Sequence, residues 1–392
     1  MKRAKTHEEI EPLRELCRTG KLFEVQAWIA AGKPVNPPKP RPKGNRRHSP
    51  MQLVIEAGFH SLVKVLLDAG AEIETDHRYS SLYHALWKDK YDIAKLLVER
   101  GADVNSVEMS TVFHTWQSRL IMFFVERGAD METGNPLAQA FCDRLWPALR
   151  VYKQFKDRFQ SFPEQANIAL RHHCREGDIK WASLMLWAGA NPYAKGPDRP
   201  EDEPDPDHDR TALELAAFYG HFDIFGIKAI RCDPNHERAR ELVRMACYGE
   251  NAGLLQFLLD RGYSVNDQTN GGSSYITLLI TSMGWESFKK NACIDTPAAR
   301  EKLKLIHMLA QHGARWIPED TGQMNRARKS LMRMEPTYTV ELVWIMAKYG
   351  GCDRSVIESL LKTPAIQDHL SWHWTRAAEL MSRLPLANAG NV

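Results

Sequence analysis

The chain has 392 residues, of which 43% are hydrophobic and 26% are charged, and its formal net charge is +3. This balance is typical of folded globular domains and excludes a wholly disordered chain. The net charge is too small to mark the whole chain as a nucleic-acid-binding protein. No run reaches the roughly 18 apolar residues of a membrane-spanning helix, and the polar first residues do not form a secretory signal. Seven scattered cysteines without a CxxC pair indicate reduced thiols, so we expect a cytoplasmic chain without a membrane partner.

One motif recurs along the chain and ends at a glycine. Its fullest copy is LLVERGADVN at residues 96–105, and shorter copies are LLDAGAEI at 66–73 and LLDRGYSVN at 258–266. Several intervals between copies are close to thirty residues, which indicates an internal repeat. The closing position is filled in turn by Gly32, Gly70, Gly101, Gly128, Gly189, Cys232, Gly262, Gly313 and, as we expect, Gly350.

A second motif opens the repeat, as in SPMQLVIEAG at residues 49–58 and TALELAAFYG at 211–220. The leading Ser or Thr is a typical helix N-cap, and proline fits the first helical position because no amide donor is lost there. Gly58 and Gly220 are predicted to take the left-handed conformation that ends a first helix. The apolar spacing that follows, as in the segment 93–97, predicts a second helix.

Together the two motifs resemble the ankyrin repeat, over roughly residues 8 to 350. The resemblance implies an all-α fold, an ankyrin-type solenoid of about ten helix–turn–helix units with projecting finger loops, here assigned to residues 1–350. Residues 351–392 are predicted to form C-terminal capping helices and a tail. The stretch 135–162 keeps two helical patterns without either motif, and we expect it to be a degenerate, weakly stacked unit. An unrelated helical solenoid with convergent endings is the alternative.

Three insertions interrupt the repeats. Residues 37–48 are proline-rich and basic, so Arg41, Lys43, Arg46 and Arg47 are candidate contacts to phosphates or to an acidic partner; the alternative is a solvated linker. Residues 197–209 are proline-rich and acidic, and are expected to be a solvated loop dispensable for folding. Residues 284–297 are less polar and are expected to pack beside their unit.

We find no sequence motif that indicates catalysis, a cofactor or a metal. Phosphate-binding, dinucleotide, hydrolase and metalloprotease signatures do not occur in the sequence. His369 and His373 stand four residues apart, but a zinc site needs two further ligands. Cys174 follows two histidines, yet a catalytic pair needs an orienting third group that the sequence does not identify. The sequence therefore predicts a non-catalytic chain without a cofactor or bound metal.

If the repeat alignment holds, the last side chains of each first helix point into the groove beside the fingers. Several of these are aromatic or cationic, which are the residue types that dominate protein-binding hot spots. The alternative is that each ring covers the base of the neighbouring finger. The candidate partner contacts are Trp87, Lys88, Arg175, Phe218, Tyr219 and Tyr248.

These observations favour a protein-interaction scaffold, either an adaptor or an inhibitor, that binds another protein through its concave face and finger loops. The alternative is a nucleic-acid-associated regulator that uses the basic loop 37–48 and the basic helix expected at 326–333. Binding of that kind would weaken steeply with salt. The acidic insertion and the near-neutral total charge argue against it.

Overall fold

The computed structural model describes residues 3–39, 48–73, 80–205, 209–267, 274–289, 297–316 and 321–371, with residues 373, 375, 378–379 and 382. Arg41, Lys43, Arg46 and Arg47 of the basic insertion lie outside the described residues, as do residues 290–296 of the third insertion. Within these ranges the regular elements are helices, and two isolated bridges are the extended pairings. A helix with the length and apolar character of a membrane span is not found in the described part.

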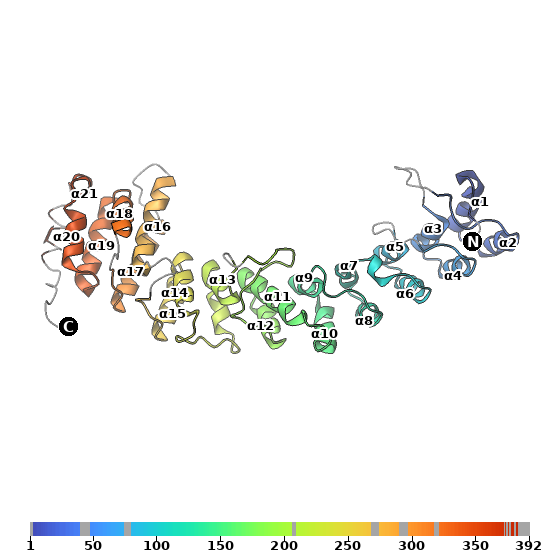
Figure 1. Ribbon diagram of the computed structural model, residues 1–392, viewed down its shortest axis with the longest axis horizontal. Coiled ribbons are helices and arrows are strands. Elements are labelled where there is room, and N and C mark those ends of the chain that lie inside the picture. Colours follow the sequence, from blue (N-terminus) through green and yellow to red (C-terminus); the bar gives the residue numbers. More distant parts are fainter. Residues whose placement is uncertain are drawn as a thin grey trace. The chain divides into compact units, whose positions relative to one another are not determined.

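The helices follow one another along the whole described chain (Figure 1). In order they are α1 (His7–Arg18), α2 (Leu22–Ala30), α3 (Pro50–Ala57), α4 (His60–Asp68), α5 (Ser81–Trp87), α6 (Tyr91–Glu99), η2 (Val104–Ser106), α7 (Met109–Phe113), α8 (Ser118–Glu126), α9 (Pro136–Cys142), α10 (Trp146–Phe155), α11 (Phe162–Glu176), α12 (Ile179–Trp187), α13 (Ala212–Tyr219), η3 (Phe222–Gly226), α14 (Ala239–Tyr248), α15 (Ala252–Asp260), α16 (Tyr275–Lys289), α17 (Pro297–Gln311), α18 (Thr321–Leu331), α19 (Pro336–Tyr349), α20 (Arg354–Leu361) and α21 (Pro364–His369).

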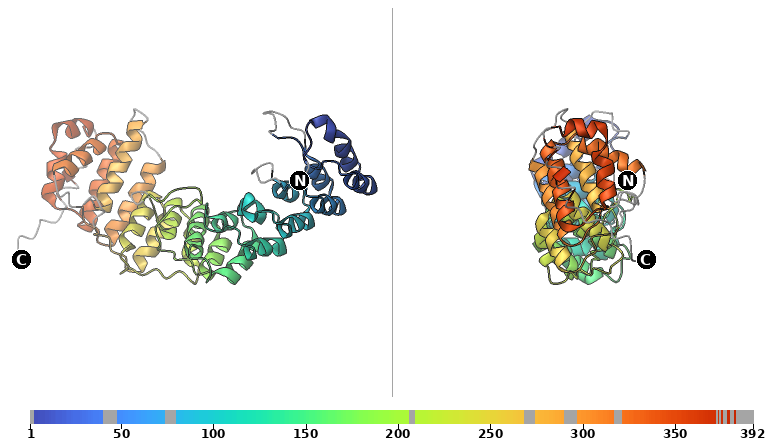
Figure 2. Two further views of the ribbon diagram at one scale, coloured as in Figure 1. Left: turned by 45° about the vertical axis from the view of Figure 1, so that its right-hand side comes forward. Right: turned by 90° about the vertical axis from the view of Figure 1, so that its left-hand side faces the viewer.

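The helices divide into two compact modules. The N-terminal module is Met1–Ala169 with Arg199–Asp202, and the C-terminal module is Leu170–Asp198 with Glu203–Val392. In each module, first helices pack on first helices and second helices on second helices (Figure 2). Thus α1, α3 and α5 are successive neighbours, as are α2, α4 and α6, and the same order holds for α14, α16 and α18. This confirms an all-α repeat of helix pairs, consistent with about ten units.

The first helices α3 and α13 start and end as the sequence predicts. Ser49 and Thr211 form capping boxes with Gln52 and Glu214, so both orphan amides at each start are satisfied. Gly58 and Gly220 end the helices with φ of 77° and 80°. At the corresponding turns of other repeats, non-glycine residues accept positive φ instead: Asp89, Trp116, Arg144 and Glu250.

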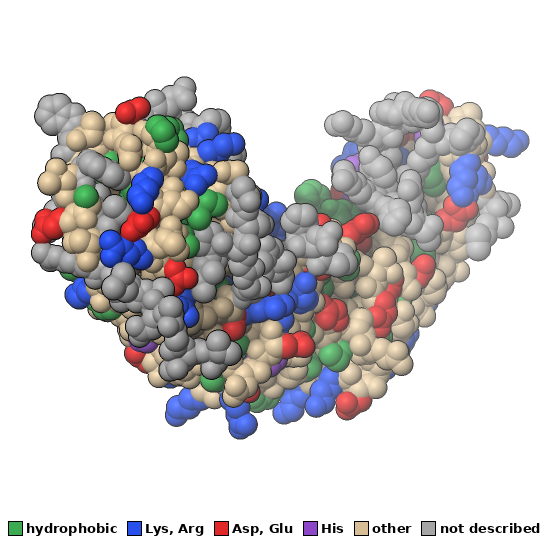
Figure 3. Space-filling view, turned by 60° about the vertical axis from the view of Figure 1, so that its left-hand side comes forward, with side chains coloured by type: hydrophobic (Ala, Val, Ile, Leu, Met, Phe, Trp, Pro, Cys, Tyr) green, Lys and Arg blue, Asp and Glu red, His purple; other side chains and the backbone are tan. Residues whose placement is uncertain are grey.

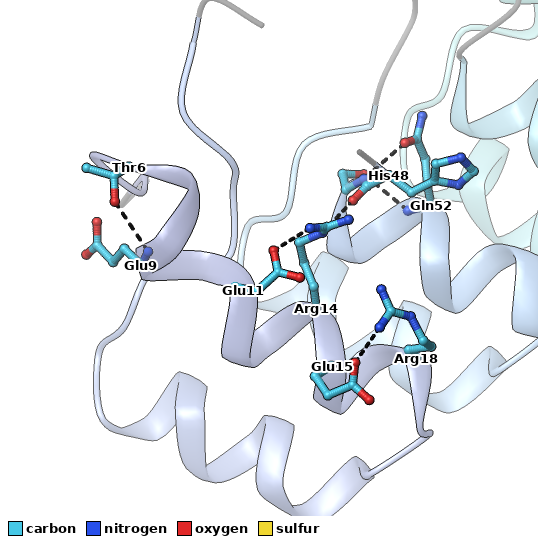
Figure 4. Close-up of polar contacts among 9 residues, drawn as sticks. Thr6, Glu9, Glu11, Arg14, Glu15, Arg18, His48 and Gln52 are labelled. Atoms are coloured by element: carbon cyan, nitrogen blue, oxygen red, sulfur yellow. Dashed lines mark hydrogen bonds and ion pairs between the residues drawn. The ribbon is translucent and has the colours of Figure 1, made fainter. Parts of the chain in front are cut away.

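At the N-terminus, polar contacts join α1 to the start of the second repeat (Figure 4). The Thr6 hydroxyl accepts a bond from the Glu9 amide at 3.3 Å and caps the helix. The buried Arg14 donates from Nε to the carbonyl oxygen of His48 at 2.8 Å, just before α3. This contact fixes the described end of the basic insertion on the first repeat.

The turn glycines also make room for the next repeat. A Cβ on Gly20 would lie 2.8 Å from the ring of Phe59, and one on Gly177 would lie 2.5 Å from Nδ1 of His221. The His221 Nε2 lies 2.8 Å from the carbonyl oxygen of Arg175, which can only accept, so this ring nitrogen donates. Glycine at these turns therefore satisfies both a backbone and a packing requirement.

An asparagine clamp joins consecutive repeats at three places. Asn36 donates from Nδ2 to the carbonyl of Gly70 at 3.0 Å, and its Oδ1 accepts from the Glu72 amide at 2.8 Å. The same pair of bonds joins Asn105 to Gly128 and Asp130, and Asn266 to Gly313 and Arg315. Because the motif Val-Asn recurs at a fixed distance after its glycine, each clamp reaches the same backbone atoms of the next repeat.

Replacing Asn36 with alanine is expected to lower the free energy of unfolding by about 1–3 kcal/mol, because it leaves part-buried backbone groups unpaired. Asn36 is only 3% exposed, whereas Asn105 is exposed and water can replace its bonds. Urea unfolding followed by circular dichroism should show a smaller loss for Asn105→Ala. Equal losses in the two variants would contradict the role assigned to burial.

The predicted degenerate repeat at 135–162 lacks both motifs but has a packed interior. Phe159 and Phe162 stack at 4.8 Å between ring centroids, and Tyr152 stacks on Phe162 at 6.1 Å. The N-cap Asn135 makes no side-chain cap on α9. Gln165 of α11, in the next repeat, caps α9 instead, and it is fully buried. These contacts give the repeat a packed interior, and its weak stacking on its neighbours stays a prediction.

The acidic insertion is more ordered than the sequence suggests. Gly196 and Arg210 form an antiparallel bridge at its base, and the Pro197 carbonyl accepts from Arg171 Nε at 2.7 Å. Asn135 donates to the carbonyl of Pro200 at 3.1 Å. Residues 201–205 are exposed. The expectation of a solvated loop is thus wrong for Pro197 and Pro200, because their carbonyls accept bonds from Arg171 and Asn135, whereas residues 201–205 are exposed as expected.

Candidate protein-binding surface

Three aromatic rings of the C-terminal module lie at the ends of first helices, and each lies beside an arginine. We call this set the arginine–aromatic row; its members are Arg175, Arg210, Phe218, Tyr219, Arg244 and Tyr248. Tyr219 and Tyr248 are 48% and 45% exposed, although aromatic rings of this size are usually buried. The row places exposed apolar area and positive charge together.

The sequence of α13 determines which side chains face outward. Its first residues, from the cap at Thr211 to Ala217, are all buried, and Ala216 and Ala217 leave space for the neighbouring helix. Phe218 and Tyr219 follow as the last two helical positions before the left-handed Gly220. The helix core is therefore complete without these rings, and they project from its end.

Cation–π contacts hold the row together. Arg175 lies 5.6 Å from the Tyr219 ring, Arg210 lies 4.6 Å from the Phe218 ring, and the two rings meet edge to face at 5.2 Å. Such contacts contribute about 0.5–1 kcal/mol at exposed sites. They fix the rings in place before any partner arrives, which reduces the entropy lost on binding.

Acidic side chains orient two of the arginines. Arg175 Nη1 lies 2.8 Å from Asp198 Oδ2, and the bond to Asp198 raises the pKa of Arg175. Arg244 donates from Nε to the buried Glu241 at 2.7 Å while its guanidinium lies 5.7 Å from the Tyr248 ring. Both guanidinium groups are thereby held against the rings.

Gly249 brings the ends of α13 and α14 close together. A Cβ at this position would lie 2.3 Å from the Phe218 carbonyl oxygen and 2.8 Å from that of Ala217. Both contacts are with backbone, so neither neighbour can move aside cheaply. The spacing between Phe218 and Tyr248 therefore depends on a glycine here.

The predicted contacts fall into two groups. The C-terminal module brings together Arg175, Phe218 and Tyr219, with Tyr248 on the next repeat. Trp87 and Lys88 form a separate pair in the N-terminal module, with Lys88 Nζ 4.3 Å from the Trp87 ring centroid and Trp87 62% exposed. These exposures agree with the prediction, which no bound partner tests.

Sequence reasoning missed Arg210 and Arg244. Arg244 precedes Tyr248 by four residues, the spacing at which helical side chains meet, so this pair could have been found from the sequence. Arg210 reaches Phe218 from the residue before the N-cap of α13. That contact depends on the bridge at the base of the acidic insertion, which no local pattern indicates.

The cysteine and histidine residues that were considered as catalytic or metal-binding candidates have structural contacts in the described fold. Burial raises the pKa of the Cys174 thiol to about 12, so it is not a thiolate at neutral pH. His173 stacks on Trp181 at 5.6 Å, and His369 Nε2 lies 2.8 Å from the Met334 carbonyl. Among the described side chains, no group of three metal-ligating residues has the geometry to hold an ion.

Comparison with known proteins identifies the class of this chain. Residues 15–108 match the family model of ankyrin repeats, in three copies. Over 227 residues, or 54% of its length, the chain is 28% identical to an ankyrin repeat and KH domain-containing protein of Caenorhabditis briggsae. The chain spans only 8% of the length of that relative. The chain therefore contains ankyrin repeats, as its two motifs predict.

A solved structure also matches the chain. It is the crystal structure of the human ASB11 ankyrin repeat domain, with 15% sequence identity and a TM-score of 0.28. The alignment covers 75% of this chain and 97% of that one.

Proposed function

We propose that this ankyrin-repeat protein is a non-catalytic scaffold of the cytoplasm, an adaptor or inhibitor that binds another protein. The contact surface is the face formed by the first-helix ends and finger loops, which the family resemblance describes as concave. In the C-terminal module its centre is the arginine–aromatic row. The observation that carries the proposal is the exposure of Tyr219 and Tyr248, each held in place by an arginine.

The row has the composition of a binding hot spot. Tyr and Arg are among the types whose truncation costs most at interfaces. Tyr buries a large area and has few rotatable bonds to lose. The three arginines make the row suitable for a partner surface that combines apolar and acidic side chains. Trp87 and Lys88 offer the same chemistry in the N-terminal module.

The nucleic-acid alternative receives less support. In the face that Figure 3 shows, Lys and Arg side chains are interspersed with Asp and Glu side chains over the described surface. A phosphate-binding surface would instead present a continuous row of available cations.

Alanine at Phe218, Tyr219 or Tyr248 is expected to leave the chain folded and to weaken partner binding by about tenfold or more. The partner would be isolated with the wild-type chain at moderate salt after nuclease treatment, and the variants compared by titration. Phe23→Ala is the matched control, because Phe23 is 79% exposed on the second helix α2. Unfolded variants, or folded variants that bind normally, would show that the rings belong to the helix stack and not to a binding surface.

A further inference from the structure

The second helix of one repeat is cut short. After α13, the chain forms only the five-residue 3₁₀ segment η3, whereas α12 before it and α15 after it each have nine residues. The rings of Phe222 and Phe225 hold η3 against Phe257 of α15, at 5.3 and 6.2 Å. The short segment η3 therefore packs against α15.

The sequence explains where this helix ends. Counted back from the closing position of each repeat (Gly70, Gly189, Cys232 or Gly262), Lys228 occupies the place that Leu66, Met185 and Leu258 fill in other repeats, where each is fully buried. Lysine cannot be buried there without a partner charge. Gly226 also lowers helix stability by about 1 kcal/mol relative to alanine, and no atom lies within 4 Å of where its Cβ would be.

Beside this segment, the surface of the neighbouring helix α12 also differs from that of the other second helices. Two residues before the closing glycine it carries Trp187, which is 65% exposed. The equivalent residues of α4, α6, α8 and α15 are Asp68, Glu99, Glu126 and Asp260, and those of α2 and α17 are Ala30 and Gln311. Ile179, at the start of α12, is 43% exposed.

A groove lies between α12 and the short segment. Its volume is about 540 Å³, and its lining includes Ile179, Leu186 and Trp187 on one side and Ile227 on the other. Along α12 the lining residues recur at helical spacing, since Ile179, Ser183 and Leu186 share one face. Asp223 and Lys228 also line the groove.

We propose that this groove binds a short amphipathic α-helix of a protein partner, which completes the outer layer of the repeat. The chain itself shows what covers this face elsewhere, because α4 packs on α2, α6 on α4, α10 on α8 and α17 on α15. The partner helix has two to three turns and apolar residues at positions i, i+3 or i+4, and i+7. This surface lies on second helices, so the inference does not depend on the arginine–aromatic row.

The test uses a probe taken from the chain. A fluorescent, helix-stapled peptide with the sequence of residues 90–100 contains α6, which covers α4 in the folded protein. It is titrated with the full chain and followed by anisotropy, beside a stapled peptide of scrambled order. We expect saturable binding of the first peptide, and at least about tenfold weaker binding by Trp187→Glu, which restores the acidic residue of the other helices.

The remaining variants separate binding from folding. Ile179→Ser should weaken binding of the peptide in the same way. Phe23→Glu, on α2, should leave the affinity for the peptide unchanged. Circular dichroism checks that each variant is folded. Equal binding of the scrambled peptide, or unchanged binding by folded Trp187→Glu and Ile179→Ser, would overturn the proposal. It would also be overturned by self-association that Trp187→Glu abolishes, which assigns the groove to a second copy. Binding only after removal of residues 383–392 would assign the groove to the chain's own end.

Discussion

Replacing Gln165 with leucine is expected to lower the free energy of unfolding by about 3 kcal/mol or more, since each buried group left unpaired costs about 1–3 kcal/mol. The Gln165 Oε1 accepts from the amides of Leu137 and Ala138 at 2.9 and 3.2 Å. Its Nε2 donates to the Met131 carbonyl at 2.7 Å. Leucine has a similar volume but can replace none of these bonds, and urea denaturation measures the loss.

Gln139→Leu provides the control for this variant. Gln139 lies on α9 of the same repeat, but it is exposed, so the change should stay within about 0.5 kcal/mol. If Gln165→Leu were as stable as Gln139→Leu, the cap on α9 would not depend on Gln165.

Alanine at Gly249 is expected to destabilise the C-terminal module by about 1–3 kcal/mol, the usual cost of forcing an extra group into a packed site. The new Cβ would meet the carbonyl oxygens of Phe218 and Ala217, so the ends of α13 and α14 must separate. Thermal unfolding should register the loss. The rings of Phe218 and Tyr248 would also move apart. The molecules of the variant that stay folded should therefore bind the partner more weakly than the wild-type chain does.

Gly253→Ala is the matched control for Gly249→Ala. Gly253 lies inside α15, and the nearest atom to its Cβ position is Asn251 Oδ1 at 3.6 Å, an ordinary contact. Alanine there should be neutral or stabilising by up to about 1 kcal/mol, because alanine favours the helix. A similar destabilisation in both variants would show that the close approach at Gly249 is not the cause.

The fold was predictable because its signals are local. A capping Ser or Thr, a left-handed glycine and a 3.6-residue apolar spacing occur within one repeat, and α3 and α13 form as these signals indicate. The packing of the 135–162 repeat was not predictable. Its cap comes from Gln165, which is 28 residues from Leu137 along the chain, and no short motif indicates that pairing.

The candidate surface was predictable in part. The position of Tyr219 before its turn glycine indicated an exposed ring, and the structure has it exposed. The cation above Phe218 was not predictable, because Arg210 is positioned by its bridge to Gly196 across the acidic insertion. The short second helix was also missed, since Cys232 keeps the regular spacing of the closing position while Lys228 interrupts the buried stripe.

The asparagine clamps have a consequence for how such a chain can change. Within the described residues, Asn36, Asn105 and Asn266 bond to the main chain of the following repeat. A main-chain partner is the same for every residue except proline, which lacks the amide donor, so most substitutions in the following repeat leave the clamp intact. Neighbouring repeats can therefore diverge in sequence, exchange binding residues or accept insertions while their register stays fixed.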